Sequence, residues 1–134
     1  MEDTPIILVG YDGSNAARAA LDLGVKHAGA FKGRLVLVRS LMSGTEKDND
    51  ESQAAEQDLA YAEQYCNAKS VPCETHLLIR GLSPGEDIIQ FAEECHASEI
   101  IMGVRRRSQV GKILFGSVAR YVILQANCPV VTVK

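Results

Sequence analysis

The residues best suited to chemistry lie in two segments, each of which follows a run of apolar residues. The first, Gly10-Tyr11-Asp12-Gly13-Ser14, follows the run at 6–9, and the second extends from Gly103 to Val118 after the run at 100–102. Glycine lets the backbone approach a ligand closely, and a helix beginning near Ser117 would offer unpaired N–H groups to an anion. The two segments therefore indicate a binding site for a small anionic ligand.

Positive charge is concentrated in the second segment. Four of the 14 Lys and Arg residues fall within 104–112, where there is no acidic residue; they are Arg105, Arg106, Arg107 and Lys112. A polyphosphate suits such a cluster. The whole chain has 17 Asp and Glu and a net charge of −3, which argues against nucleic acid or an anionic membrane as a partner. The alternatives are a solvated loop or, with Ser108, a basophilic kinase site.

Three better-known phosphate motifs do not match. A Walker A loop around Gly111-Lys112 would need glycine where Arg106 stands and Ser or Thr where Ile113 stands. The dinucleotide fingerprint G-x-G-x-x-G has Asp12 in place of its second glycine. A response-regulator receiver would need an aspartate at the end of its third strand, where the chain has Ile79-Arg80.

The cysteines and histidines do not form a metal-binding pattern. No C-x-x-C occurs among Cys66, Cys73, Cys95 and Cys128, and the three histidines are scattered. A zinc site and a thioredoxin-type pair both need closer spacing. We interpret the cysteines as buried free thiols in preference to a redox role, because a chain that is 46% hydrophobic does not need disulfides to fold.

The positioning elements follow from the apolar pattern. Continuous apolar runs at 6–9, 35–38, 100–102 and 130–133 indicate strands covered on both faces, and 73–79 is a further strand with partial alternation. Four helical stripes lie between them: Ala17, Leu21, Gly24 and Ala28; Ala55, Leu59, Ala62 and Cys66; Ile88, Phe91 or Ala92, and Cys95; and Val118, Val122 and Ala126. This alternation specifies a doubly wound α/β sheet with right-handed crossovers.

The connections and helix starts complete this prediction. We expect an exposed loop over 43–50, a second helix from about Glu51, and a connection over 104–115. Ser14 and Ser117 are expected to cap the helices that follow them. Asp12 is either a ligand contact or a turn residue bonded to its own backbone. The length predicts one domain over residues 1–134.

The same residues resemble the universal stress protein family over the whole chain. The resemblance rests on residues 10–14, on Gly103 followed by Gly116-Ser117-Val118, and on the closing stretch Ala126-Asn127-Cys128-Pro129-Val130-Val131. It implies an open, twisted, five-stranded parallel sheet of order 3-2-1-4-5 with helices on both faces, which is a Rossmann-like fold. ATP-binding members carry G-x-x-G-x9-G-[ST]; Arg106 stands in place of the second glycine.

The resemblance also implies a nucleotide site around Gly10 and Tyr11. Asp12 would contact the adenosine portion, Val38 would meet the adenine through its backbone, and Gly103 would lie against the ribose. Phosphate would be held by Gly116, Ser117 and Val118. Arg106 would either crowd the loop or face the phosphates together with Arg105, Ser108 and Lys112.

The function that we expect is a cytoplasmic, nucleotide-responsive stress protein. ATP is favoured over ADP or AMP, with Mg²⁺ accompanying it and Asp12 as the one metal ligand that can be named. No residues pair as nucleophile and base, so the protein is not primarily an enzyme and is at most a slow ATPase. The alternative is a nucleotide-free interaction or holdase-like module.

Partners and location follow from the two ends of the chain. The terminal strand, Val130-Val131-Thr132-Val133, would leave an open sheet edge that a homodimer covers, as the resemblance also implies. The acidic start, Met1-Glu2-Asp3-Thr4, does not match a secretory signal. The apolar runs fall short of the roughly 20 residues that span a bilayer, so no membrane partner is expected.

Overall fold

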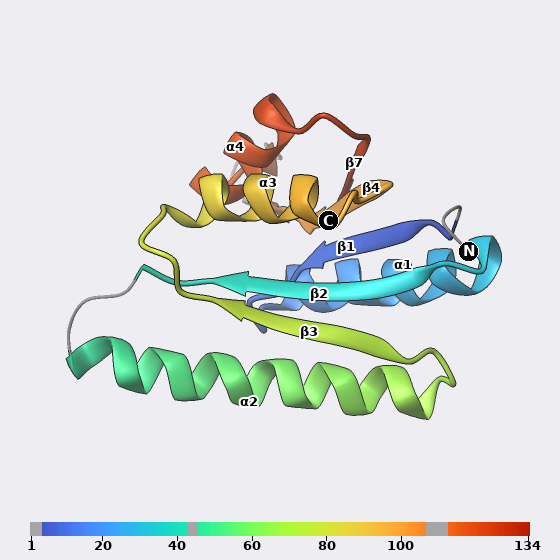
Figure 1. The fold of residues 1–134 in the computed structure, drawn as a ribbon, viewed down its shortest axis with the longest axis horizontal. Coiled ribbons are helices and arrows are strands. Elements are labelled where there is room, and N and C mark those ends of the chain that lie inside the picture. Colours follow the sequence, from blue (N-terminus) through green and yellow to red (C-terminus); the bar gives the residue numbers. More distant parts are fainter. Residues whose placement is uncertain (1–3, 43–45, 107–112) are drawn as a thin grey trace.

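The computed structural model describes residues 4–42, 46–106 and 113–134, and it gives only the backbone for 46–49, 105–106 and 113–114. Strands and helices alternate along the chain (Figure 1). The elements are β1 (Ile6–Gly10), α1 (Asn15–Phe31), β2 (Arg34–Ser40), α2 (Glu46–Ala68), β3 (Cys73–Leu78), α3 (Pro84–Glu94), β4 (Glu99–Gly103), β5 (Arg105–Arg106), β6 (Ile113–Leu114), α4 (Ser117–Gln125) and β7 (Val130–Val133).

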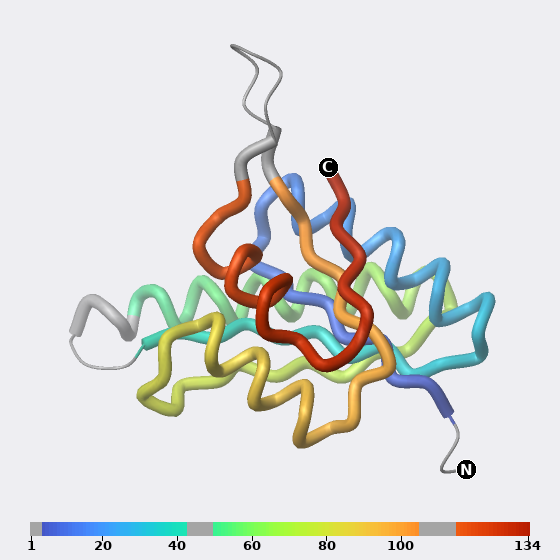
Figure 2. Tube along the Cα trace, turned by 90° about the horizontal axis from the view of Figure 1, so that it is seen from above, coloured from blue at the N-terminus to red at the C-terminus, as the bar shows by residue number. Residues whose placement is uncertain are grey.

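The main sheet has the predicted topology. Its described strands form a five-stranded parallel sheet in the order β3-β2-β1-β4-β7, which confirms the order 3-2-1-4-5 because β7 is the fifth strand of this sheet. In Figure 2 the C-terminal segment (red) runs alongside the β4 segment (orange). Strand order reverses at β1, which lies between β2 and β4, and all carboxyl ends meet at one edge beside this switch point.

Helices cover both faces of the sheet and bury the apolar residues of the strands. Along β1, Ile7 and Val9 pack with α1 and α2, whereas Leu8 packs on the opposite face with α3 and α4. In Figure 1, α2 lies below the strands, and α3 and α4 lie above them. The predicted stripes of α1 and α2 are confirmed, since their eight residues are buried. The two large side chains among them, Leu21 and Leu59, each contribute about 1.5–3 kcal/mol on burial.

Several boundaries differ from the sequence prediction. α2 begins at Glu46 instead of about Glu51. The prediction missed this first turn because residues 46–50 are polar and show no apolar stripe, whereas the acidic residues among them favour the N-terminus of a helix. The third and fourth helices end before Cys95 and Ala126, which are their C-caps. The expected connection over 104–115 contains an antiparallel pair, β5 with β6. No helix in the described ranges has the length and apolarity needed to cross a membrane.

The predicted cap of α1 is confirmed. Ser14 has extended backbone angles, and its Oγ accepts a hydrogen bond of 3.1 Å from the N–H of Ala17. This bond satisfies one of the donors that the first helical turn leaves unpaired. It also determines where the chain turns from the end of β1 into α1.

A buried carboxylate joins the end of β2 to the start of α3. Asp87 is 0% exposed; its Oδ2 accepts a 2.7 Å bond from Ser40 Oγ, and its Oδ1 accepts a 2.6 Å bond from Arg80 Nε. Arg80 also donates to Glu94 at 2.9 Å, and these two carboxylates raise the pKa of its guanidinium. A buried charge is tolerated only when it is paired in this way.

The Asp87→Asn substitution should therefore destabilise the protein. Asparagine keeps the size of the side chain but replaces one acceptor oxygen with a donor that faces Ser40 or Arg80. We expect the free energy of unfolding, measured by urea denaturation, to fall by about 1–3 kcal/mol. Glu86→Gln, an exposed change in the same helical turn, is the control and should stay within about 0.5 kcal/mol. Equal effects of the two changes would contradict this role for Asp87.

Candidate functional site

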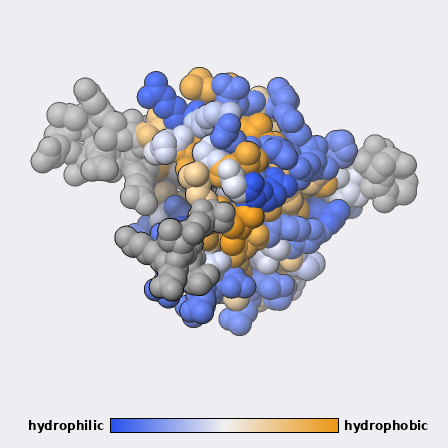
Figure 3. Space-filling view, turned by 60° about the vertical axis from the view of Figure 1, so that its left-hand side comes forward, coloured by the Kyte–Doolittle hydropathy of each residue, from blue (hydrophilic) through white to orange (hydrophobic). Residues whose placement is uncertain are grey.

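A pocket of about 670 Å³ lies at the carboxyl edge of the sheet. Figure 3 turns this edge toward the viewer and shows apolar surface with hydrophilic surface around it. The ends of β1, β2 and β4 and the starts of α1, α3 and α4 all contribute to its walls. Its volume lies within the roughly 300–1,000 Å³ that is typical of small-molecule sites.

The structure brings most of the predicted site residues together in this pocket. Eight of them line it: Gly10, Tyr11, Asp12, Val38, Gly103, Gly116, Ser117 and Val118. Arg105 and Arg106 form β5, of which only the backbone is described, and Lys112 lies outside the described residues. Because β5 follows the end of β4 and β6 leads into α4, the base of this hairpin starts from the same edge of the sheet.

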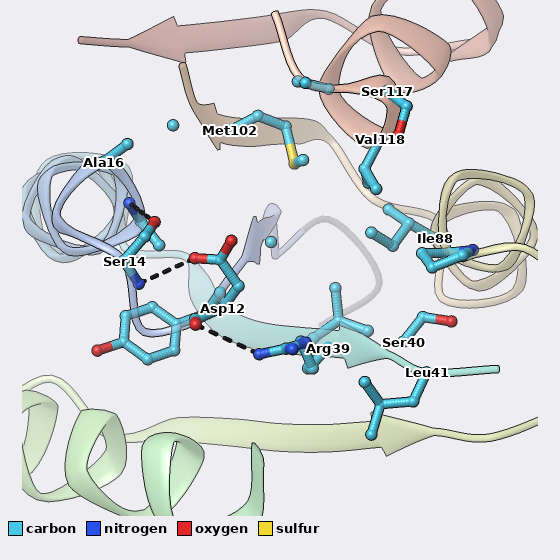
Figure 4. A pocket seen from close by; sticks show the side chains of 18 of the residues that line it. Asp12, Ser14, Ala16, Arg39, Ser40, Leu41, Ile88, Met102, Ser117 and Val118 are labelled. Atoms are coloured by element: carbon cyan, nitrogen blue, oxygen red, sulfur yellow. Dashed lines mark hydrogen bonds between the residues drawn. The ribbon is translucent and has the colours of Figure 1, made fainter. Parts of the chain in front are cut away.

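Asp12 makes the turn that was predicted as its alternative role. Its Oδ1 accepts a 2.9 Å bond from the N–H of Ser14, and its carbonyl accepts a 3.3 Å bond from Arg39 (Figure 4). Gly13 follows with φ of 79°, and a Cβ there would lie 2.7 Å from the carboxylate of Asp58 in α2. The turn therefore places Asp12 at the pocket without excluding a contact with a ligand.

Tyr11 contributes mainly to packing. Its side chain is 2% exposed and belongs to the core cluster on the α1–α2 face, where its hydroxyl interacts with Arg18. Burial raises the pKa of this hydroxyl. Its backbone N–H donates a 2.9 Å bond to the carbonyl of Val38. Tyr11 thus holds the end of β1 against β2.

The hydrogen bond from the N–H of Tyr11 occupies the backbone carbonyl of Val38 and so affects the predicted contact between Val38 and an adenine. Val38 was expected to meet an adenine through its backbone, but its carbonyl already accepts this bond from Tyr11. Backbone groups alternate between the two edges of a strand, and Leu41 donates to Leu78 of β3. Ser40 therefore directs its N–H and C=O toward the β1 side, past the end of β1, where Arg39, Ser40 and Leu41 also line the pocket.

Packing requires a glycine at position 103, whereas the described neighbours do not require one at position 116. A Cβ at Gly103 would lie 2.3 Å from the carbonyl oxygen of Ala16, so glycine is required for β4 to pack against α1. At Gly116 a Cβ would have no described atom within 4 Å, and the backbone angles, φ −65° and ψ 163°, suit any residue. The fold among the described residues therefore does not explain the glycine at 116.

The prediction that Ser117 caps α4 is wrong. The extended residue before this helix is Gly116, which makes it the N-cap, and Ser117 is the first helical residue. The Gly116 carbonyl accepts the first helical bond, 2.9 Å long, from Arg120. The N–H groups of residues 117–119 precede this bond and have no partner within the helix, and all three residues line the pocket.

Several pocket residues were not identified from the sequence. The apolar ones are Leu41, Met42, Pro84, Ile88, Met102 and Phe115, and the charged ones are Arg39 and Glu51. Figure 4 shows Met102 and Ile88 on the same side as Ser117 and Val118, across from Arg39 and Asp12. Residues 39–42 directly follow an apolar run, so the rule that ligands bind at carboxyl ends of strands would have found them. Among the described side chains, no three potential metal ligands cluster together.

Alanine substitutions should separate the two glycines. Gly103→Ala forces β4 away from Ala16 and should lower the free energy of unfolding by about 1–3 kcal/mol or more. Gly116→Ala should change it by less than about 0.5 kcal/mol, because the loss of unfolded-state entropy offsets the weaker N-cap. Thermal or urea denaturation of both variants measures this difference. A similar loss in both would show that residue 116 is constrained by packing.

Comparison with known proteins gives a consistent result. The model of the universal stress protein family matches residues 4–134. A universal stress protein from Thermus aquaticus is 32% identical over 134 residues, covering 96% of this chain and 97% of that protein.

Solved structures agree with this match. The universal stress protein from Archaeoglobus fulgidus superimposes with a TM-score of 0.88 at 36% identity and 98% coverage of both chains. A structure from the same organism in complex with dAMP has a TM-score of 0.81 at 33% identity and 100% coverage of both. The sequence resemblance is thus confirmed, and the chain belongs to the universal stress protein family.

Proposed function

We propose that residues 1–134 form one domain that binds an adenine nucleotide, with ATP favoured, and acts as a nucleotide-responsive regulator. The observation that carries this proposal is that the N-terminus of α4, with Gly116 as its N-cap, lines the pocket. Glycine there leaves open space that no described neighbour fills. A phosphate group could occupy this space and accept bonds from the unpaired N–H groups of the first turn.

The rest of the pocket suits a nucleoside. Met102, Ile88 and Val118 provide apolar surface for a flat base. The outward backbone groups of Ser40 offer one donor and one acceptor, which is what the edge of an adenine requires. The related archaeal protein bound to dAMP supports this class of ligand. We place the base at the end of β2 and the phosphates at α4.

The preference for ATP rests on charge beyond the first phosphate. The basic residues of 105–112 fall in the part of the sequence between β4 and α4. Arg105, Arg106 and Lys112 would face the outer phosphates, and Arg106 would replace the backbone contact of the missing motif glycine with a side-chain contact. Mg²⁺ usually binds one or two carboxylates together with the phosphates, and Asp12 would be its protein ligand.

The pocket is better suited to binding than to hydrolysis. Its described titratable residues include Asp12, Arg39 and Glu51, and no histidine is among its lining residues. His27 is bonded to Glu99 at the opposite end of β4, at 2.5 Å. Without an oriented base, we expect at most slow ATPase activity. Arg106 is the feature that favours the second candidate, a nucleotide-free interaction or holdase-like module.

Isothermal titration calorimetry, which measures the heat of binding, tests this proposal with ATP, ADP and AMP in the presence of Mg²⁺. We expect binding by the wild type and at least about tenfold weaker binding by Gly116→Val, a loss of about 1.4 kcal/mol, because the added methyl groups occupy the phosphate position. Gly29→Val is the matched control, since a Cβ there also has open space and the residue lies outside this pocket.

Two further results decide between the alternatives. Asp12→Asn retains an acceptor for the turn, so weaker binding with unchanged stability would assign the carboxylate to the ligand or its Mg²⁺. An absence of heat with every nucleotide would refute the proposal in favour of the nucleotide-free module. Phosphate release measured in the same samples tests for slow hydrolysis.

We also propose a homodimer through β7. This strand pairs with β4 on one side and ends the sheet on the other. The carbonyl of Val133 accepts a hydrogen bond from the N–H of Val104, which directly follows β4, so alternation directs the backbone groups of Val130 and Thr132 to the outer edge. Leu124, 68% exposed in the preceding helix, adds apolar surface. A second copy related by a two-fold axis would cover this edge.

Sedimentation of two Thr132 variants tests the dimer. Thr132→Pro removes an outward N–H while leaving the bonds to β4 in place, so we expect a monomer with an intact fold. Thr132→Val keeps the N–H and should remain dimeric. A wild type that sediments as a monomer at micromolar concentration, or a dimer that tolerates the proline, would contradict pairing through this strand.

A further inference from the structure

Two cysteines meet where α2 turns back into the sheet. Cys66 lies in the last turn of α2, and Cys73 is the first residue of β3. The turn between them is closed by backbone bonds from Ser70 to Asn67 (3.0 Å) and from Val71 to Cys66 (2.9 Å), with Ser70 in the left-handed region at φ 61°. Cys66 belongs to the buried core cluster on the α1–α2 face, Cys73 packs against the same cluster, and the two thiols interact with each other.

The two thiols differ in access. Cys66 is 0% exposed within the core on the α1–α2 face, whereas Cys73 is half-buried. Cys73 lines a hollow of about 360 Å³, together with Gly29, Gly33 and Pro72. This hollow lies at the amino ends of β2 and β3, at the edge of the sheet opposite the nucleotide pocket. A small oxidant can reach Cys73 through it, but not Cys66.

The two thiols also differ in acidity. The interaction with Cys66 favours the thiolate of Cys73 and lowers the pKa of Cys73, although burial and the nearby Glu63 oppose this shift. The same interaction, together with burial, raises the pKa of Cys66. The other charged residues lining the hollow are Arg34 and Glu74, which form an ion pair with each other. Cys73 is therefore the better nucleophile of the two.

We propose that Cys66 and Cys73 form a redox-active dithiol, which hydrogen peroxide entering the hollow oxidises to an intramolecular disulfide. The Cys73 thiolate attacks one peroxide oxygen, the O–O bond breaks, and water leaves after protonation, so that Cys73 becomes a sulfenic acid. Cys66 then attacks the Cys73 sulfur; the S–O bond breaks and a second water leaves with the Cys66 proton. In sum, two thiols and one peroxide give one disulfide and two waters.

The other two cysteines serve as internal references. Cys95 and Cys128 are also half-buried, but burial raises the pKa of both. Their thiols are therefore less ionised at neutral pH and should react more slowly with peroxide. A non-specific oxidation would modify them along with Cys73, whereas the proposed reaction is confined to one pair.

Peptide mapping provides a direct test. Trypsin cleaves at Lys69, between the two cysteines, so that Cys66 falls in peptide 48–69 and Cys73 in peptide 70–80; Cys95 and Cys128 fall in two others, 81–105 and 121–134. The wild type is treated with hydrogen peroxide, free thiols are alkylated, and the digest is analysed by mass spectrometry. We expect peptides 48–69 and 70–80 to be disulfide-linked, with two hydrogens fewer than their sum, and to separate on reduction.

Variants assign the two roles. In Cys66→Ser, Cys73 should accumulate as sulfenic acid, trapped by dimedone; in Cys73→Ser, Cys66 should remain a thiol. The matched controls Cys95→Ser and Cys128→Ser should form the linked peptides as the wild type does. Absence of the linked peptides from the oxidised wild type, or earlier modification of Cys95 or Cys128, would overturn the proposal. The wild-type result does not depend on whether a variant folds or on nucleotide binding.

Discussion

The central strand β1 is paired on both edges and covered on both faces, and this constraint determines where a ligand can bind. Its backbone bonds to β2 and β4, while its side chains fill both core clusters. A ligand therefore cannot approach β1 along its length. It can approach only where the strand ends, at Gly10, where the neighbouring strands and the starts of three helices surround the opening.

The fold was largely predictable because it depends on burial, which leaves a regular trace in the sequence. The runs at 6–9 and 35–38 are continuous because both faces of those strands are covered. Features that depend on particular atoms left no such trace. The start of α2 at Glu46 falls in a polar stretch, and the N-cap of α4 shifted from Ser117 to Gly116 because backbone angles, not residue preference, determined it.

The candidate site was predictable in its location more than in its contacts. Residues 10–12, 103 and 116–118 were found because glycines and polar residues stand out after apolar runs. Met102 and Ile88 were missed because an apolar pocket wall resembles an apolar core in a sequence. The interaction between Cys66 and Cys73 was missed for a different reason: a spacing of seven residues gives no signal unless the chain reverses direction between them.

The length of α2 has a consequence for communication across the molecule. At 23 residues, it extends for roughly 34 Å. Glu51 near its start lines the pocket at the carboxyl edge of the sheet, and Cys66 near its end lies beside the start of β3 and the hollow. A rigid secondary-structure element is one of the means by which energetic coupling is carried between distant sites. Any free energy that couples the two ends is reciprocal. Oxidation of the cysteine pair would then change the affinity of the pocket for its ligand by the same factor by which the bound ligand changes the oxidation equilibrium of the pair.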